Sequence, residues 1–104
     1  MARLIILSSK GQRTVELRSS TRIGRVPGNT VEAPDMYMSK YHCVIERRDD
    51  DFWLRDLGSV NGTHINDERV DEDRLLRHND QIQMGSTWAW FDDGRGPCVL
   101  RVYA

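Results

Sequence analysis

The chain has 104 residues, with 15 Lys and Arg against 16 Asp and Glu, which gives a formal net charge of −1. A chain of this length fits one domain with one hydrophobic core, so we expect a single domain over residues 1–104 with its core at about residues 4–103. The balanced charge excludes general attraction to nucleic acid or to an anionic membrane, so any anion-binding site has to be local.

The apolar stretches and the cysteines bear on the compartment. The longest apolar stretch, Leu4–Leu7, is far shorter than a membrane span, and the first residues lack the hydrophobic segment of a signal peptide. We therefore expect a cytoplasmic monomer without membrane contacts. Cys43 and Cys98 have no metal-like spacing, and in such a chain they are expected to remain free thiols.

The apolar pattern along the chain has a short period, is rich in β-branched and aromatic residues, and is broken by clusters of Gly, Asn and Asp. This pattern is typical of an all-β sandwich of two mainly antiparallel sheets. Short polar segments predict hairpin connections at Ser8–Gln12, Asp49–Asp51 and Asp92–Pro97. The expected strands, in chain order, are Arg3–Leu7, Thr14–Arg18, Thr21–Gly24, Thr30–Glu32, His42–Arg48, Phe52–Asp56, Thr63–Ile65, Gln81–Met84, Thr87–Phe91 and Val99–Tyr103.

Two short motifs in the first half of the chain offer groups that bind anions. Arg25, after Gly24, closes a predicted strand and carries a permanently charged planar fork. Ser39 and Lys40, in the run Ser-Lys-Tyr-His, add a hydroxyl and an ammonium. Taken singly, Arg25 would be a surface arginine over apolar neighbours, Ser39 a turn cap and Lys40 a solvated charge.

Two further motifs follow in the second half. Asn61-Gly62 is, without any function, a strong hairpin signal, because both residues tolerate positive φ. An Asn amide at a loop tip can also hydrogen-bond both the N–H and the C=O of an extended peptide. In the run from Asn79 to Gly85, Asn79 can adopt a left-handed turn conformation, and Ile82 and Met84 are expected in the core.

In this order and spacing, the four motifs resemble the forkhead-associated (FHA) domain, whose pattern runs Gly-Arg, Ser-x-x-His, Asn-Gly-Thr and Gly-Asp-x-Ile with a closing Gly. The resemblance covers Leu4 to Tyr103 and implies an FHA-type (SMAD/FHA-like) sandwich. It also implies a signalling module that binds phosphothreonine in extended segments of partner proteins phosphorylated by Ser/Thr kinases. The chain departs from the family at Val60, where Thr or Ser is common, and at Asn79, where Gly is usual.

The resemblance assigns roles residue by residue. His42 would support the loops through hydrogen bonds and would not touch the ligand. The residues implied to support the site are Gly24, His42, Gly62 and Thr63. The residues implied to bind the phosphopeptide are Arg25, Tyr37, Ser39, Lys40, Val60 and Asn61.

Other functions find less support in the sequence. No nucleophile, acid–base pair or phosphate-cradling loop has the spacing of an enzyme site, so we expect neither catalysis nor a cofactor. His42, His64 and His78 lack metal-ligand spacing, and Asp49–Asp51 and Asp71–Asp73 lack that of a calcium loop, so no metal is expected. The main alternative is a phosphate-independent interaction or assembly module on the same fold. A nucleic-acid-binding barrel ranks third, because the net charge is not basic and basic residues are not interleaved with aromatic ones. Trp53, Trp88 and Trp90 are expected to pack in the core or on a sheet face.

Overall fold

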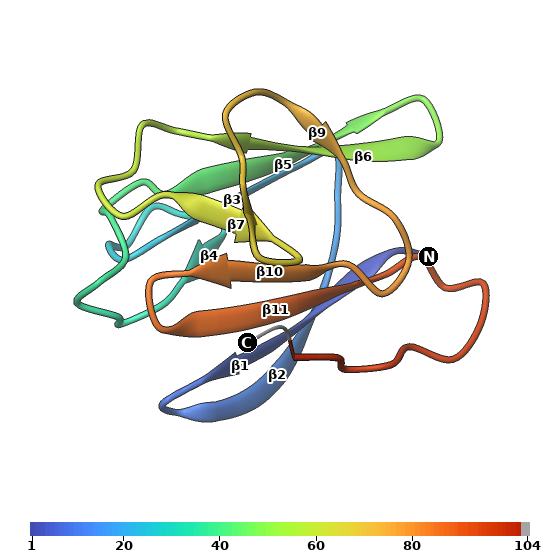
Figure 1. Ribbon diagram of the computed structural model, residues 1–104, viewed down its shortest axis with the longest axis horizontal. Coiled ribbons are helices and arrows are strands. Elements are labelled where there is room, and N and C mark those ends of the chain that lie inside the picture. The colour runs from blue at the N-terminus through green and yellow to red at the C-terminus, as the bar shows by residue number, and fades with distance from the viewer. Residues whose placement is uncertain (103–104) are drawn as a thin grey trace.

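A computed structural model describes residues 1–102, and within them we find eleven β-strands and no helix (Figure 1). The strands form a six-stranded sheet in the order β2-β1-β11-β10-β7-β8 and a five-stranded sheet in the order β4-β3-β5-β6-β9. Only β3 and β4 pair in parallel; the other paired strands are antiparallel. The strands are β1 (Arg3–Ser8), β2 (Gly11–Glu16), β3 (Ser20–Gly24), β4 (Val31–Glu32), β5 (Cys43–Arg48), β6 (Asp51–Asp56), β7 (Thr63–Ile65), β8 (Glu68–Arg69), β9 (Arg74–Leu75), β10 (Gln81–Met84) and β11 (Thr87–Asp92).

One hydrophobic core fills the space between the two sheets. Alternate residues of each strand enter it, as the period of a β-strand requires. The six-stranded sheet contributes Ile82 and Met84, both fully buried, and the five-stranded sheet contributes Ile45 and Leu54. The predicted all-β sandwich of two mainly antiparallel sheets is confirmed, as are the core positions of Ile82 and Met84.

The expected strand at Val99–Tyr103 is wrong for residues 99–102, and Tyr103 lies outside the described residues. A further strand has no place beside β11, because β1 and β10 already pair with its two edges. The segment instead lies over the outer face of the sheet, where the indole Nε1 of Trp90 donates to the Arg101 carbonyl at 2.8 Å. Ala89 and Phe91 point into the core, so Trp90 between them points to the outer face of the sheet. It is nevertheless only 2% exposed. The predicted hairpin at residues 92–97 is therefore wrong as well.

The hairpin interpretation of Asn61-Gly62 is also wrong. These residues connect β6 to β7, which belong to different sheets, and only Gly62 has a positive φ, of 80°. The two-residue hairpin lies just beyond, at Asn66-Asp67 between β7 and β8, with φ values of 49° and 69°. Two successive positive φ values are the signature of a type I′ turn, whose twist matches that of the flanking strands.

Two further features of the described residues are the absence of a membrane-spanning helix and the state of the two cysteines. Within residues 1–102 no helix has the length and apolar character needed to cross a bilayer. Cys43 and Cys98 are free thiols, Cys43 being fully buried.

The strands β8 and β9, of two residues each, were not predicted, because such short pairings leave no alternating pattern in the sequence.

The turn at Asp67 yields a test of this geometry. An Asp at a φ of 69° is strained, so Asp67→Gly is expected to raise the free energy of unfolding by about 0.5 kcal/mol, the relief of strain exceeding the entropy cost of glycine. Urea denaturation measures the change. Asp50→Gly in the β5–β6 turn is the control, since Asp50 has no positive φ and its replacement should not stabilise. An equal gain in both variants would contradict the turn assignment.

Candidate functional site

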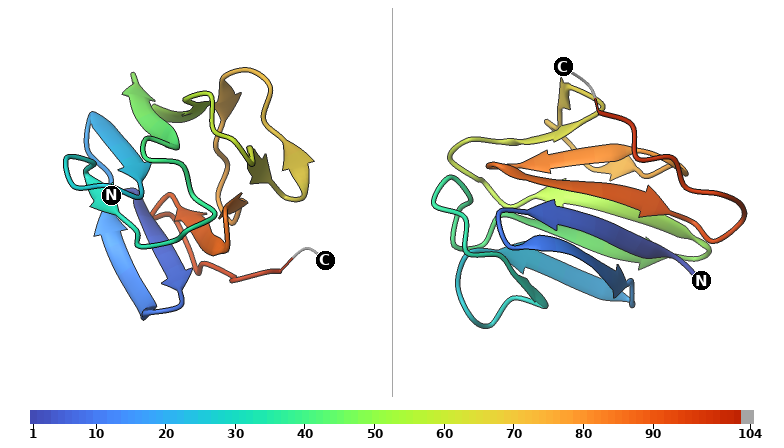
Figure 2. Two further views of the ribbon diagram at one scale, coloured as in Figure 1. Left: turned by 90° about the vertical axis from the view of Figure 1, so that its left-hand side faces the viewer. Right: turned by 90° about the horizontal axis from the view of Figure 1, so that it is seen from below.

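The loops that carry the predicted binding side chains lie together at one end of the sandwich (Figure 2, left panel). They are the β3–β4 loop, residues 25–30, the β4–β5 loop, residues 33–42, and the β6–β7 loop, residues 57–62. The sheets fix the entry and exit of each loop, so the loop tips converge although they are distant in sequence.

Arg25 joins the first loop to the second. Its backbone N–H donates to the Ser39 carbonyl and its guanidinium Nε donates to the Met38 carbonyl, both at 3.1 Å. The described residues supply no partner for the two terminal nitrogens of the guanidinium, and the side chain is half-buried. Arg25 is therefore held at its inner end, while the forked end remains available to an anion.

Ser39 joins the second loop to the third. Its hydroxyl oxygen accepts a hydrogen bond from the Val60 backbone N–H at 2.9 Å. A serine hydroxyl that accepts in this way can still donate its own proton to another group. Lys40 is exposed, and its backbone carbonyl accepts from the Asn29 side chain at 2.8 Å, which fixes the backbone and leaves the ammonium in solvent.

Asn61 lies at the exposed tip of the third loop. Its side-chain nitrogen donates to the Tyr37 carbonyl at 2.8 Å, so one N–H is used within the protein. The amide oxygen and the second N–H remain for a peptide backbone. A hollow of about 240 Å³ adjoins Asn61 and is lined by Tyr37, Asn61, Gly62, His64, Gln83 and Gly85.

His42 lies beneath the exposed side chains and is fully buried. Its Nδ1 accepts from the Ser39 N–H at 3.0 Å, and its Nε2 lies 2.9 Å from the Gly62 carbonyl oxygen. Since a carbonyl only accepts, Nε2 must carry the proton and the ring is the neutral Nε2–H tautomer. The imidazole thus connects the second and third loops directly below Ser39.

Asp56 anchors the third loop, a role that was not predicted from the sequence. Its carboxylate accepts from the backbone N–H groups of Gly58 and Ser59 and from the hydroxyls of Ser59 and Thr63. Burial raises the pKa of Asp56, but the hydrogen bonds from Ser59 and Thr63 outweigh burial and the pKa lies below its usual value. The available sequence signal was an Asp two residues before a Gly-Ser pair, since an Asx turn bonds the Asp side chain to the backbone N–H two residues on.

Asp35 anchors the second loop, and it too was missed. Its carboxylate accepts from the Tyr37 N–H, from the N–H and hydroxyl of Ser86, and from the Thr87 hydroxyl. Gly85 allows this contact, because a Cβ there would lie 2.9 Å from the Asp35 carboxylate. No local pattern reveals this bond, since its partners are about fifty residues apart in the chain.

Gly24 is required by close packing beneath Arg25. A Cβ at this position would overlap the Lys40 carbonyl oxygen and lie 2.6 Å from the Asn29 side-chain nitrogen. Gly24→Ala is therefore expected to lower the free energy of unfolding by about 1–3 kcal/mol, because the second loop must move. Chemical denaturation measures this change. Gly96→Ala is the control, since a Cβ there meets open space, and equal effects of both changes would refute the steric argument.

The buried His42 predicts a pH dependence of stability. Burial lowers the pKa of His42, and the Gly62 carbonyl and Asp56 only partly oppose it. The unfolded chain therefore binds this proton at a higher pH than the folded protein, so stability falls as pH drops below about 6.5, with a slope of up to about 1.4 kcal/mol per pH unit. Urea denaturation between pH 7.5 and 5 measures the slope, and His42→Gln should reduce it. An undiminished slope in the variant would assign the loss of stability to other groups.

Comparisons with known proteins agree with this architecture. The model of the FHA domain family matches residues 21–85. The oxoglutarate dehydrogenase inhibitor of Corynebacterium diphtheriae is 32% identical over 84 residues, which cover 81% of this chain and 58% of that protein. The glycogen accumulation regulator GarA of Mycobacterium tuberculosis is 32% identical over 75 residues, which cover 72% of this chain and 46% of that protein. The chain thus spans about half the length of these curated relatives.

Solved structures are similar over nearly the whole fold. An FHA domain from a structural study of phosphothreonine-dependent FHA domain interactions superposes with a TM-score of 0.80 at 30% identity, covering 88% of this chain and 94% of that chain. The FHA domain of FhaA, solved in complex with the intracellular domain of Rv3910, gives a TM-score of 0.80 at 30% identity, with 88% and 99% covered. The family match at residues 21–85 contains all four motifs and more than half of the sequence, and the chain belongs to the forkhead-associated domain family.

Proposed function

We propose that this domain binds phosphothreonine in extended segments of partner proteins that are substrates of Ser/Thr kinases, and that it carries out no chemistry itself. One observation supports this function above the others. The loops bring the Arg25 guanidinium, the Ser39 hydroxyl and the Asn61 amide to one exposed surface, each bound to its neighbours through some of its polar atoms only. FHA domains are binding modules, and we expect this one to act in cytoplasmic signalling.

The phosphate site in this proposal consists of Arg25, Ser39 and Lys40. The free end of the guanidinium would take two phosphate oxygens, and the Ser39 hydroxyl would donate to a third. Lys40 would add a point charge from the rim. Val60 contributes its backbone N–H to Ser39, and its side chain, 86% exposed, would contact the peptide next to the phosphothreonine.

Asn61 would hold the peptide backbone beside the phosphate. Its amide oxygen and remaining N–H are suited to the N–H and C=O of an extended segment. Tyr37, 61% exposed, borders the hollow next to Asn61 and would contact a neighbouring side chain of the ligand. Three charge-assisted hydrogen bonds at ~2 kcal/mol each give about 6 kcal/mol, and micromolar binding needs about 8, so the backbone contacts must supply the rest.

The remaining predicted residues would support the site without touching the ligand. His42 and Gly62 connect the second and third loops, and Thr63 donates to the Asp56 carboxylate at 2.7 Å. Gly24 allows the close approach of the Lys40 backbone below Arg25.

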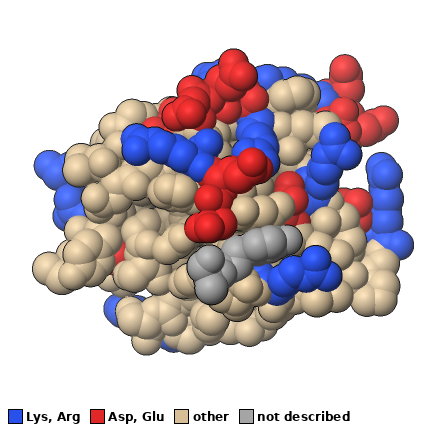
Figure 3. Space-filling view, in the orientation of Figure 1, with Lys and Arg blue, Asp and Glu red and all other residues tan. Residues whose placement is uncertain are grey.

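A second candidate function is phosphate-independent assembly on the same loops. Large apolar side chains are exposed around the site, among them Met36 at 85% and Val60 at 86%. Such side chains could bind a partner without phosphate. Nucleic acid is less well supported, because acidic and basic side chains are interspersed on the face shown in Figure 3, without a continuous basic stripe across it.

Arg25→Ala tests the proposal directly. We expect it to abolish measurable binding of a phosphothreonine peptide selected from an oriented peptide library, because the forked charge is removed, while the melting temperature changes little. Calorimetry measures the affinity, and Arg18→Ala, an exposed arginine on the β2–β3 connection, is the matched control.

The same peptide without phosphate decides between the two candidate functions. Dephosphorylation should weaken binding by about 4 kcal/mol or more, because two charge-assisted hydrogen bonds to the phosphate disappear together. Equal affinity for both peptides would support the assembly module, and unchanged affinity of a folded Arg25→Ala variant would remove Arg25 from the site.

A further inference from the structure

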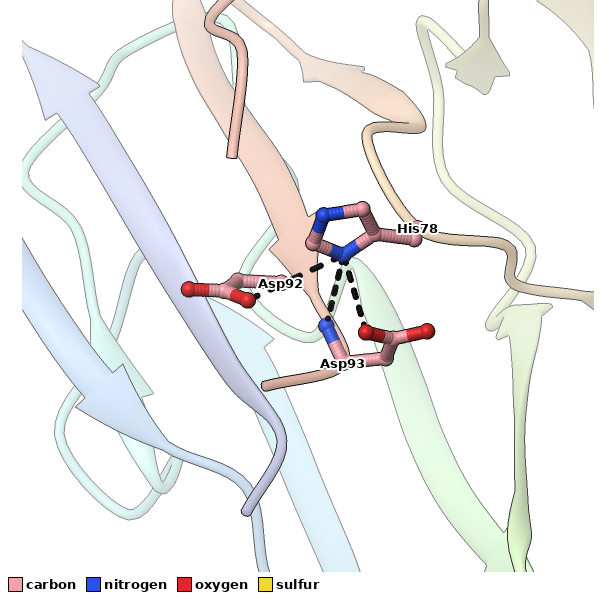
Figure 4. Close-up of side chains that lie close together, drawn as sticks. All are labelled: His78, Asp92 and Asp93. Atoms are coloured by element: carbon pink, nitrogen blue, oxygen red, sulfur yellow. Dashed lines mark hydrogen bonds and ion pairs between the residues drawn. The ribbon is translucent and has the colours of Figure 1, made fainter. Parts of the chain in front are cut away.

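Three potential metal ligands converge at the end of the sandwich opposite the loops of Arg25 and Asn61 (Figures 1 and 4). His78 lies in the connection between β9 and β10, Asp92 ends β11, and Asp93 follows it. The His78 Nδ1 lies 3.0 Å from an Asp93 carboxylate oxygen and 3.7 Å from one of Asp92. One ligand atom from each residue lies within 4.8 Å of the others.

The hydrogen bonds of the ring determine which nitrogen faces the carboxylates. The His78 Nε2 lies 2.9 Å from the Pro97 carbonyl oxygen, which can only accept, so Nε2 carries the proton. The Asp93 backbone N–H points at Nδ1 from 3.1 Å, so Nδ1 presents a lone pair. The ring nitrogen with the lone pair is thus the one that faces both carboxylates.

Each of the three ligand atoms accepts one backbone N–H in this structure. His78 Nδ1 accepts from Asp93, and the carboxylate oxygens of Asp92 and Asp93 that face it accept from Gly94 and Arg95. The two oxygens keep a second lone pair for a metal ion, whereas at Nδ1 a metal ion would replace the Asp93 N–H. It would also offset the repulsion between Nδ1 and the Asp93 carboxylate oxygen 3.0 Å away. Ligands at about 2.1 Å in a tetrahedron lie about 3.4 Å from one another. The two distances from Nδ1 to the carboxylate oxygens, 3.0 and 3.7 Å, lie on either side of that value.

The surroundings orient two of the ligands as they do in metal sites. Pro97 fixes the imidazole through Nε2, and the Arg3 guanidinium binds the outer oxygen of Asp92 at 2.8 Å. Ligating histidines and carboxylates are commonly fixed by such outer bonds. A hollow of about 710 Å³, lined in part by His78 and Asp93, gives water access to the cluster.

We propose that His78, Asp92 and Asp93 bind one divalent transition-metal ion of the zinc class, with a water molecule as the fourth ligand. One imidazole and two carboxylates suit Zn²⁺, whereas Mg²⁺ requires octahedral oxygen ligands. The positive charge of Arg3 and the Asp93 amide compete with the ion, so the affinity is moderate. Arg77 and Arg95 also line the hollow and oppose a second cation.

A bound ion would connect the β9–β10 connection to the segment after β11. It would favour the folded over the unfolded chain, because the ligands converge only in the fold. The proposed site shares no residue with the phosphopeptide site, so it is independent of the proposed function.

Zinc titration of the full chain tests this site. Cys98→Ser is made first, because a partly exposed free thiol can bind zinc on its own and would obscure the proposed site. In this background calorimetry should show one ion per chain, and zinc should raise the melting temperature. His78→Gln and Asp93→Asn should each weaken zinc binding by at least about tenfold. His64→Gln, a half-exposed histidine at the other end, should leave zinc affinity unchanged.

Histidine nitrogen NMR on the natural chain provides a measurement that needs no variant. Zinc should shift the Nδ1 resonance of His78, with Nε2 still protonated. Binding that disappears with Cys98→Ser, persists after His78→Gln or Asp93→Asn, or shifts Nε2 instead would overturn the proposal. The absence of zinc binding would reduce the cluster to an ion pair and would overturn it equally.

Discussion

The buried imidazole of His42 is the contact on which the loop end of this domain depends. It receives a hydrogen bond from the backbone of Ser39 and donates one to the carbonyl of Gly62, so a single ring fixes two loops that are far apart in the chain. Because both ring nitrogens are used inside the protein, the imidazole has no capacity left for a ligand. The exposed groups of Ser39 and Asn61 are positioned by a residue that does not reach the surface.

Two carboxylates extend this support outward from His42. Asp35 connects the second loop to the turn between β10 and β11, and Asp56 closes the third loop on itself. Each accepts several hydrogen bonds, which satisfies a charge that would otherwise be costly to bury. The ordered inner layer lets the outer side chains stay partly unpaired, which is the condition for binding an anionic ligand without first breaking internal contacts.

The sequence by itself determined the fold class and predicted which residues form the candidate site. The period-two pattern of Gln81–Met84 and its neighbours predicted a sandwich, because one face of each strand must be apolar. The order of the motifs at Arg25, Ser39 and Asn61 predicted a phosphothreonine-binding family, and the family match followed. These features are local or are ordered along the chain, so they can be recognised without coordinates.

The tertiary structure alone decided which residues meet. Asn61-Gly62 has the composition of a hairpin turn, but it connects two strands that belong to different sheets and do not pair. Asn66-Asp67 makes the hairpin turn instead. Val99–Tyr103 has the composition of a strand, yet both edges of β11 are occupied. The partners of Asp35 and the approach of His78 to Asp92 likewise depend on sheet order, because hydrogen bonds and charges act over a few ångströms in space and not along the sequence.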